Sequence, residues 1–282
     1  MEYGTGAGRA VCPVCPHHCR LPEGAYGRCR ARRNIGGQVV CANYGKVTAV
    51  ALDPIEKKPI AFFRPGSKVL SVGSFGCTLS CPFCQNHEIA AAGEKDLGPL
   101  YEISPEELCL LAKRERARGN IGAAFTYNEP LAGYEYVRDS AKLIREAGMV
   151  NVLVTNGCAE LPVLEELLPY VDAMNIDLKV FRPEIYRSLG GDLDTVLRFI
   201  ERAKEQCHVE ITSLIVPGMN DDPEDMRREA KWIAGLDPEI PLHITRYFPR
   251  YRYREPATDP ALLRRLKGIA EKHLSRVLLG NV

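Results

Sequence analysis

Three cysteines, Cys77, Cys81 and Cys84, follow one another with the spacing C-x3-C-x2-C. Thiolates at such short spacing bind three irons of a [4Fe–4S] cluster and leave the fourth iron open to a small molecule. The same thiols would instead form a zinc site if His87 supplied a fourth ligand. The spacing predicts a metal centre, with the iron–sulfur cluster as the preferred interpretation.

Four further cysteines lie close together near the N-terminus, at Cys12, Cys15, Cys19 and Cys29. Their spacing is typical of a closed structural zinc site, and an auxiliary iron–sulfur cluster is the alternative. Residues 1–40 contain few apolar side chains, so a bound metal would supply folding free energy that a hydrophobic core cannot provide there. We expect a second metal site, with zinc preferred because nothing in the sequence requires a second electron carrier.

The composition of the 282 residues excludes several classes of protein. The formal net charge of +1 argues against a nucleic-acid-binding surface. No run of 18 apolar residues is present, and residues 1–11 lack the pattern of a secretory signal. Eleven cysteines are too few for a disulfide scaffold, so their clusters indicate metal or redox chemistry in a reducing compartment. We expect a cytoplasmic protein with no membrane or nucleic-acid partner.

Short segments with β propensity alternate with helical patterns from Lys68 onward. The predicted strands are 68–74, 121–126, 151–155, 173–178, 208–215, 242–247 and 276–279. Ser104-Pro105-Glu106-Glu107 is typical of a helix start, and Asp222-Pro223 and Asp259-Pro260 repeat the Pro signal. This alternation predicts an α/β fold with a parallel sheet and right-handed crossovers.

Six strand–helix units are fewer than the eight of a closed barrel, so the pattern allows a partial barrel or an open doubly wound sheet. Residues 68–282 would form this main domain. Residues 1–67 lack the alternation and are expected to form a small Cys-rich metal-binding module with short β-hairpins, such as 38–42 with 46–52 around Tyr44-Gly45.

Both architectures bind ligands at the carboxyl ends of their strands. The three closely spaced cysteines follow the first predicted strand, and polar residues end the next five. These polar residues are Asn128, Glu129, Thr155, Asn156, Asp177, Lys179, Thr212, Ser213 and His243. Since the strand ends meet at one mouth, we expect a single ligand site there.

The C-x3-C-x2-C motif with Phe83 before its last cysteine resembles that of the radical S-adenosylmethionine (SAM) enzymes. Further segments resemble the AmmeMemoRadiSam-system radical SAM proteins, a family similar to the pyruvate formate-lyase activating enzymes. These segments are Tyr44-Gly45, Asp53–Pro59, Cys84-Gln85-Asn86, Thr126–Pro130 and Gly280-Asn281.

This resemblance implies a partial (β/α)6 barrel and a [4Fe–4S] cluster chelated by SAM. Reductive cleavage of SAM would give a 5′-deoxyadenosyl radical that abstracts hydrogen from an unidentified substrate. An activating enzyme for a glycyl-radical enzyme is the alternative within this class, and a non-catalytic zinc-binding protein is the alternative from another class. The implied partners are an electron donor of the flavodoxin or ferredoxin type and the other proteins of the AmmeMemoRadiSam system.

The segment Thr126–Pro130 stands where the family has Gly-Gly-Glu-Pro, whose polar groups bind the amino group of SAM. The resemblance therefore assigns Asn128 and Glu129 to this amino group. Tyr127-Asn128 replaces the two glycines, which allow the backbone to approach SAM closely. The sequence thus keeps the polar acceptors but changes the shape of this part of the site.

The resemblance places the other polar strand ends around SAM as well. It implies that Thr155, Asn156, Asp177 and Lys179 lie near SAM, that Thr212 or Ser213 binds the ribose, and that His243 lies beside the nucleoside. Val154 and Thr212 replace an Asp and an Arg of the activating enzymes. Together with the N-terminal module and an Arg/Tyr-rich loop at 246–254, these differences predict a substrate other than a glycyl-radical protein.

Overall fold

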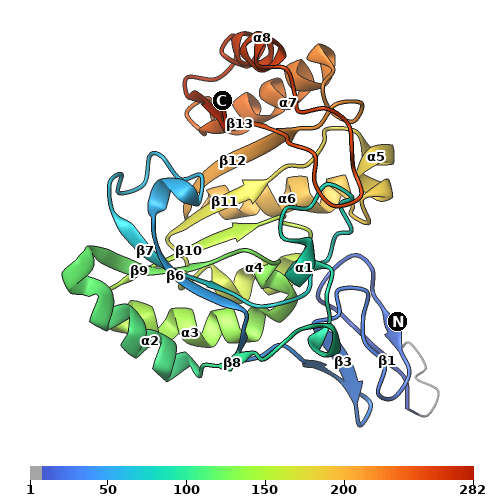
Figure 1. The fold of residues 1–282 in the computed structure, drawn as a ribbon, viewed down its shortest axis with the longest axis vertical. Helices are drawn as coiled ribbons and strands as arrows, with labels where there is room; N and C mark the ends of the chain where they lie inside the picture. The colour runs from blue at the N-terminus through green and yellow to red at the C-terminus, as the bar shows by residue number, and fades with distance from the viewer. Residues whose placement is uncertain (1–7) are drawn as a thin grey trace.

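The computed structural model describes residues 8–282, and its main feature is an eight-stranded sheet (Figure 1). Seven strands run parallel and one, β6, pairs antiparallel with β7. The strands in spatial order are β14 (Val277–Gly280), β13 (Leu242–Arg246), β12 (His208–Ile215), β11 (Ala173–Asp177), β10 (Val150–Thr155), β9 (Asn120–Phe125), β7 (Lys68–Gly73) and β6 (Ala49–Pro54).

The order of the strands distinguishes the two architectures that the sequence allows. From β7 to β14 the spatial order follows the chain order without reversal, as in a (β/α) barrel, whereas a doubly wound sheet reverses at a switch point. Strands β6 and β14 are the edges of the sheet, so the barrel is open between them. The predicted partial barrel of the radical SAM type is confirmed.

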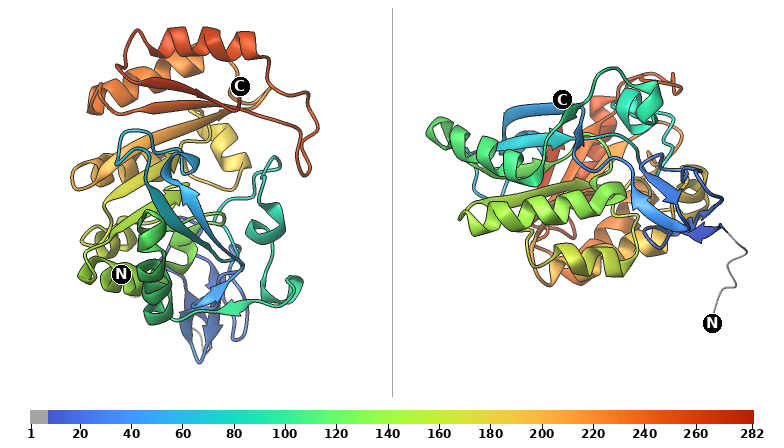
Figure 2. Two further views of the ribbon diagram at one scale, coloured as in Figure 1. Left: turned by 60° about the vertical axis from the view of Figure 1, so that its left-hand side comes forward. Right: turned by 90° about the horizontal axis from the view of Figure 1, so that it is seen from below.

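Helices connect consecutive parallel strands and pack along the sheet (Figures 1 and 2). They are α1 (His87–Ala90), α2 (Pro105–Arg114), α3 (Tyr134–Glu146), α4 (Leu161–Leu167), α5 (Pro183–Ser188), α6 (Leu193–Lys204), α7 (Pro223–Leu236) and α8 (Pro260–Ala270), with 3-10 turns η1 (Ile55–Lys57), η2 (Glu94–Asp96), η3 (Glu115–Arg118) and η4 (Pro130–Gly133). None of the helices among residues 8–282 combines the length and apolar character needed to cross a membrane.

Local chemistry explains where these helices begin and which faces they cover. At α2, Ser104 accepts a hydrogen bond from the amide of Glu107, whose carboxylate accepts one from the Ser104 amide. In β11, Met174 and Ile176 belong to the large core cluster that the helices share with the sheet. Alternation along the strand turns Asn175 to the opposite face, which is the barrel interior.

The N-terminal part of the chain pairs differently from the expected hairpin. Strand β4 (Gln38–Cys41) pairs with β3 (Arg32–Ile35), and β5 (Lys46–Val47) pairs with β8 (Tyr101–Glu102). The hairpin turn is Gly36-Gly37, with φ of 62° and 79°, because a two-residue turn that matches the strand twist needs positive φ at both positions. The expected hairpin around Tyr44-Gly45 is therefore wrong.

The first 67 residues are not confined to a separate module. Strands β1 (Ala10–Val11) and β2 (Arg20–Leu21) form a small sheet, and residues 1–7 lie outside the described part. Strand β6 instead joins the main sheet, and the chain after it enters the barrel interior. There Ile55 and Ile60 pack against Val69, Ala124, Val152 and Ala173 at the amino-terminal end of the barrel.

A buried carboxylate fastens this internal segment to the barrel wall. Glu210 on β12 accepts hydrogen bonds from the amides of Ala61 at 3.0 Å and Phe62 at 2.8 Å. Its oxygens also lie 2.8 Å from Nε2 of His208 and 2.6 Å from Nε2 of His243. Burial by itself raises the pKa of Glu210, but the two histidines and the two amides outweigh it and lower the pKa to about 2.

We expect Glu210→Gln to reduce the free energy of unfolding by about 3 kcal/mol at pH 7, because it leaves buried partners unsatisfied. Since the folded-state pKa lies below its ordinary value of 4.5, this contribution is full above about pH 4.5 and decreases as the pH falls toward 2. Urea unfolding of both proteins at pH 7 and pH 3 measures it. The exposed Glu239→Gln is the control, and an unchanged stability of Glu210→Gln at pH 7 would contradict the assignment.

Candidate functional site

The three closely spaced cysteines lie on the loop that follows β7, here called the cysteine loop (residues 74–86). Burial raises the pKa of all three thiols, that of Cys81 to about 12, and smaller increases come from Cys81 and Cys84 at Cys77 and from Cys84 at Cys81. Three convergent thiols of this kind are the donor set that an iron–sulfur cluster requires. The residues therefore fit the expected cluster.

An ion pair at the end of β11 faces these thiols. Lys179 Nζ lies 2.9 Å from Asp177 Oδ2. Burial lowers the pKa of Lys179, but Asp177, Cys81 and Cys84 outweigh it and hold the pKa above its ordinary range. The structure thus places Asp177 and Lys179 beside the cysteine loop, and Lys179 supplies a positive charge next to two thiols that must ionise to bind metal.

The end of β10 contacts the same loop. The side-chain nitrogen of Asn156, Nδ2, lies 3.6 Å from Cys77 Sγ and donates a hydrogen bond to Thr78 Oγ1 at 3.1 Å. Thr155 turns the other way, and its hydroxyl donates to Glu129 Oε1 at 2.6 Å. Of these two predicted residues, Asn156 therefore touches the site directly, whereas Thr155 acts on Glu129.

Glu129, in the segment after β9, has a buried carboxylate that accepts three hydrogen bonds. It accepts hydrogen bonds from the backbone amide of Leu131 at 3.0 Å and from the backbone amide of Asn156 at 2.8 Å, in addition to the one from the Thr155 hydroxyl. Burial raises the pKa of Glu129 to about 7, although these hydrogen bonds oppose the change. In the structure this carboxylate caps η4 and fixes the end of β10. Its expected contact with SAM stays a prediction.

Asn128 holds the beginning of the cysteine loop. Its Oδ1 accepts from the Ser74 amide at 2.9 Å, and its Nδ2 donates to the carbonyls of Phe75 at 3.1 Å and Gly76 at 3.2 Å. The side chain therefore satisfies backbone groups of a loop that has no regular secondary structure. The sequence did not reveal this supporting role, and the expected contact of Asn128 with the amino group of SAM stays a prediction.

The remaining predicted residues divide between the two faces of the sheet. Thr212 faces the barrel interior and donates to Asn175 Oδ1 at 3.0 Å, and His243 contacts Glu210 in the same interior. Ser213 points outward and donates to the buried Glu229 of α7. Because successive residues of a strand face opposite sides, Ser213 cannot share the site with Thr212, and its expected contact with the ribose is wrong.

The four N-terminal cysteines also converge. Burial is the main cause of the raised pKa of Cys12, Cys15 and Cys29. Each of these pKa values is raised further by at least one other cysteine of the group, which includes Cys19. Cys29 lies against the cysteine loop, because a methyl group on Gly76 would collide with the Cys29 carbonyl oxygen and only glycine fits there. His17 Nε2 is 3.0 Å from the Thr78 carbonyl oxygen. The N-terminal segment that carries these cysteines therefore contacts the cysteine loop.

Neither of the two cysteine groups has the geometry that holds a single metal ion. Within residues 8–282, no set of three or more His, Cys, Asp or Glu side chains has the geometry that holds one metal ion. His87, the fourth ligand in the zinc alternative, stacks on Tyr251 with 4.3 Å between ring centroids. The metal at the four N-terminal cysteines stays a prediction that rests on their spacing and convergence.

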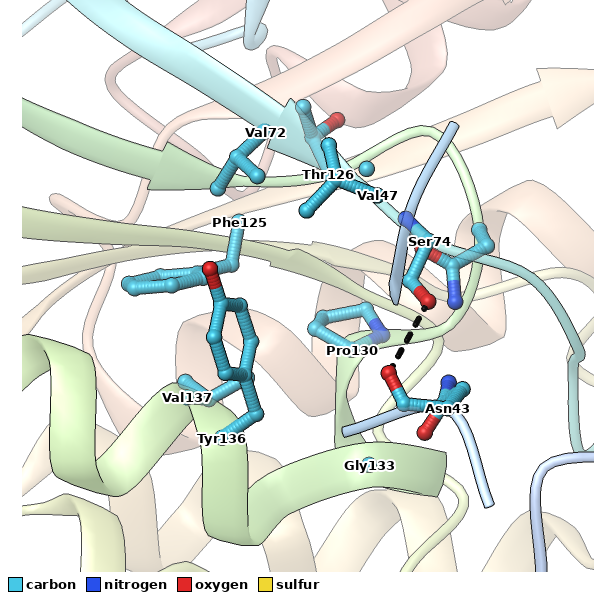
Figure 3. A pocket seen from close by; sticks show the side chains of 12 residues that line it. Asn43, Val47, Val72, Ser74, Phe125, Thr126, Pro130, Gly133, Tyr136 and Val137 are labelled. Carbon is cyan, nitrogen blue, oxygen red and sulfur yellow. Dashed lines mark hydrogen bonds between the residues drawn. The ribbon is translucent and has the colours of Figure 1, made fainter. Parts of the chain in front are cut away.

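The Arg/Tyr-rich segment after β13 covers part of the cysteine loop. The Arg252 amide donates to the Pro82 carbonyl at 2.9 Å, and Tyr253 packs edge-on against Phe83 with 6.4 Å between ring centroids. A small cavity of about 20 Å³ lies between Val72, Phe125 and Tyr136 (Figure 3). Its volume admits about one water molecule, so it is not a substrate site.

Residues 71–230 match the family model of the radical SAM superfamily, and the chain belongs to this superfamily. It is 38% identical over 275 residues to an uncharacterized protein of Methanocaldococcus jannaschii, covering 96% of this chain and 81% of that protein. It is 29% identical over 220 residues to pyruvate formate-lyase 1-activating enzyme of Escherichia coli K12, covering 72% and 88% of the two chains.

Solved structures agree with the fold. A radical SAM methyltransferase from Sphaerobacter thermophilus superposes with a TM-score of 0.58 at 16% identity, over 77% of this chain and 67% of that chain. Streptococcus suis SuiB bound to S-adenosylmethionine gives a TM-score of 0.57 at 14% identity, over 73% and 48%. Family membership implies a [4Fe–4S] cluster and SAM, and the convergent thiols agree with the cluster.

We expect replacement of Cys77, Cys81 and Cys84 together by Ser to remove about four irons per chain after anaerobic reconstitution, because each thiol is a ligand of the same cluster. Iron and zinc analysis measures the loss, with Cys207→Ser as a control remote from the loop. Zinc or iron that remains in the triple variant reports the metal of the four N-terminal cysteines. Iron content equal to that of the wild type would contradict the assignment of the cluster.

Proposed function

We propose that this protein is a radical SAM enzyme that cleaves SAM reductively and abstracts a hydrogen atom from its substrate, an oxidoreductase-type radical reaction. A bound cluster, once reduced by an external electron donor, would supply the electron that cleaves SAM to methionine and a 5′-deoxyadenosyl radical. The observation that carries this proposal is the convergence of three thiols with Lys179 and Asn156 at the carboxyl ends of parallel strands. Cys77, Cys81 and Cys84 would hold the cluster.

The polar groups around the loop suggest how SAM is held. The Asp177 side chain is 28% exposed and faces the loop beside Lys179, so it can accept hydrogen bonds from the amino group or ribose of SAM. Asn156 can orient the cosubstrate from the neighbouring strand. Thr212 and His243 lie deeper in the barrel, and the buried Glu129 carboxylate already accepts three hydrogen bonds but keeps an acceptor position on Oε2.

We favour direct chemistry on a substrate other than a glycyl-radical protein. An activating enzyme must admit a loop of a large partner, whereas here the segment after β13 packs on the cysteine loop at Pro82 and Phe83. The similarity to the Escherichia coli activating enzyme keeps glycyl-radical activation as the second candidate. The motifs shared with AmmeMemoRadiSam-system proteins support membership of that system and pairing with its other components.

The surface beside the cysteine loop supports an acidic electron donor as partner. Residues 8–43 contain six arginines and one glutamate, although the whole chain carries a net charge of only +1. Exposed Arg28 lies near Gly190, which also neighbours Ser80 of the loop, and exposed Arg30 lies near Gly93, which follows α1. A positive surface next to the cluster would attract negatively charged flavodoxin or ferredoxin.

We expect anaerobic incubation with SAM and dithionite to produce 5′-deoxyadenosine and methionine, and the triple Ser variant of the cysteine loop to produce neither. Chromatography with mass detection measures both products. The same reaction with candidate partner proteins, followed by electron paramagnetic resonance, separates the two candidate functions. A stable glycyl-radical doublet on a partner would favour activation, and absence of SAM cleavage by the iron-loaded wild type would contradict the proposed function.

Charge reversal of Arg28 and Arg30 to Glu should slow reduction of the cluster by an acidic ferredoxin or flavodoxin about tenfold at low salt, because electrostatic attraction speeds encounter. Stopped-flow absorbance measures the rate. Reduction by dithionite should not change, and the double variant Arg264→Glu and Arg265→Glu on α8 is the matched control. Equal slowing by both double variants would contradict a docking surface at residues 8–43.

A further inference from the structure

Tyr127 has an unusual backbone for a bulky residue. Its φ is +73°, in the left-handed region that favours glycine. A strained conformation of this kind persists only when the surrounding contacts determine it, and such positions cluster at functional sites.

The phenol of Tyr127 is anchored inside the barrel. Its hydroxyl donates to Asp53 Oδ2 at 2.9 Å, and the same carboxylate accepts from Lys58 Nζ and Ser71 Oγ, each also at 2.9 Å. The ammonium group of buried Lys58 lies 4.7 Å from the centroid of the Tyr127 ring. A cation over the ring and a charged acceptor at its hydroxyl together fix the side chain.

The environment also determines which form of the phenol is present. Burial and the neighbouring Asp53 raise the pKa of Tyr127 to about 12, so the hydroxyl stays protonated and donates at physiological pH. On the strand before the cysteine loop, Gly73 provides the room for the ring, because a methyl group there would come within 2.7 Å of Tyr127 Cδ2. The ring therefore packs directly on the strand that leads into the loop.

The backbone around Tyr127 holds the cysteine loop at both ends. Its carbonyl oxygen accepts from Asn86 Nδ2 at 2.7 Å, two residues after the last cysteine. The following residue, Asn128, holds the carbonyls of Phe75 and Gly76 before the first cysteine. One short segment thus fixes the entry and the exit of the loop, and the phenol connects this segment to Asp53.

We propose that Tyr127 is a positioning residue that couples the cysteine loop to the Asp53–Lys58 ion pair and so sets the placement of SAM on the cluster. This inference rests on the proposed function and deepens it. One hydrogen-bonded network thus joins Tyr127 to residues of two other segments, Asp53 with Lys58, and Asn86.

The test uses the iron-loaded full chain and two variants that break the network at different bonds. Tyr127→Phe removes the hydrogen bond to Asp53, and Asn86→Ala removes the hydrogen bond to the Tyr127 carbonyl. Tyr44→Phe is the matched control, because Tyr44 donates to Asp139 at 2.8 Å from a partly exposed site. Measurements are iron content, the electron paramagnetic resonance spectrum of the reduced cluster with and without SAM, melting temperature, and KM and kcat for SAM cleavage.

Both network variants should keep about four irons at the cysteine loop and show an altered spectrum with SAM, while Tyr44→Phe matches the wild type. The KM for SAM should rise about tenfold in Tyr127→Phe, with a smaller change in kcat, as expected for loss of a charge-assisted hydrogen bond. A lower melting temperature with unchanged spectrum and KM in both network variants would show a structural brace only and overturn the inference. Absence of a cluster signal in the wild type would instead overturn the proposed function.

Discussion

A loop without regular secondary structure must satisfy its backbone polar groups through its neighbours, and this requirement governs the site. The cysteine loop needs partners for its carbonyls and amides while its thiols stay free to bind metal. Asn128 supplies partners at the entry, Asn86 connects the exit to Tyr127, and the Ser80 amide donates to the Leu189 carbonyl at 2.8 Å in the middle. The side chains that shape the loop are therefore more numerous than those that would touch iron or SAM.

The sequence predicted the fold well because parallel strands and capped helices have strong local signals. The strand His208–Ile215 has the predicted bounds, and the others differ by one residue at one or both ends. The order of strands, which distinguishes a partial barrel from a doubly wound sheet, depends on long-range pairing and came only from the resemblance. The N-terminal hairpin was mispredicted because Gly36-Gly37 provides a better turn than Tyr44-Gly45.

The structure adds details of the candidate site that the sequence pattern did not reveal. The strand ends predicted a shared site, and Asn156, Asp177 and Lys179 do lie beside the cysteine loop at the carboxyl edge of the parallel sheet, while their contacts with SAM stay predictions. Spacing alone does not reveal which polar groups are already engaged, so the three donors to Glu129 were unforeseen. The outward direction of Ser213 follows from strand alternation once Thr212 is placed inside.

The contact between the N-terminal cysteines and the barrel constrains the order in which the chain can fold. The Val14 carbonyl accepts from the Glu160 amide at 3.0 Å, and the Cys29 backbone packs on Gly76. Residues 8–43 are synthesised before the barrel, yet the barrel surface that they contact is complete only after Glu160 has been synthesised. Such contacts between distant residues slow folding. The four thiols therefore spend this interval without their final neighbours, and early metal binding would protect them from oxidation and mispairing.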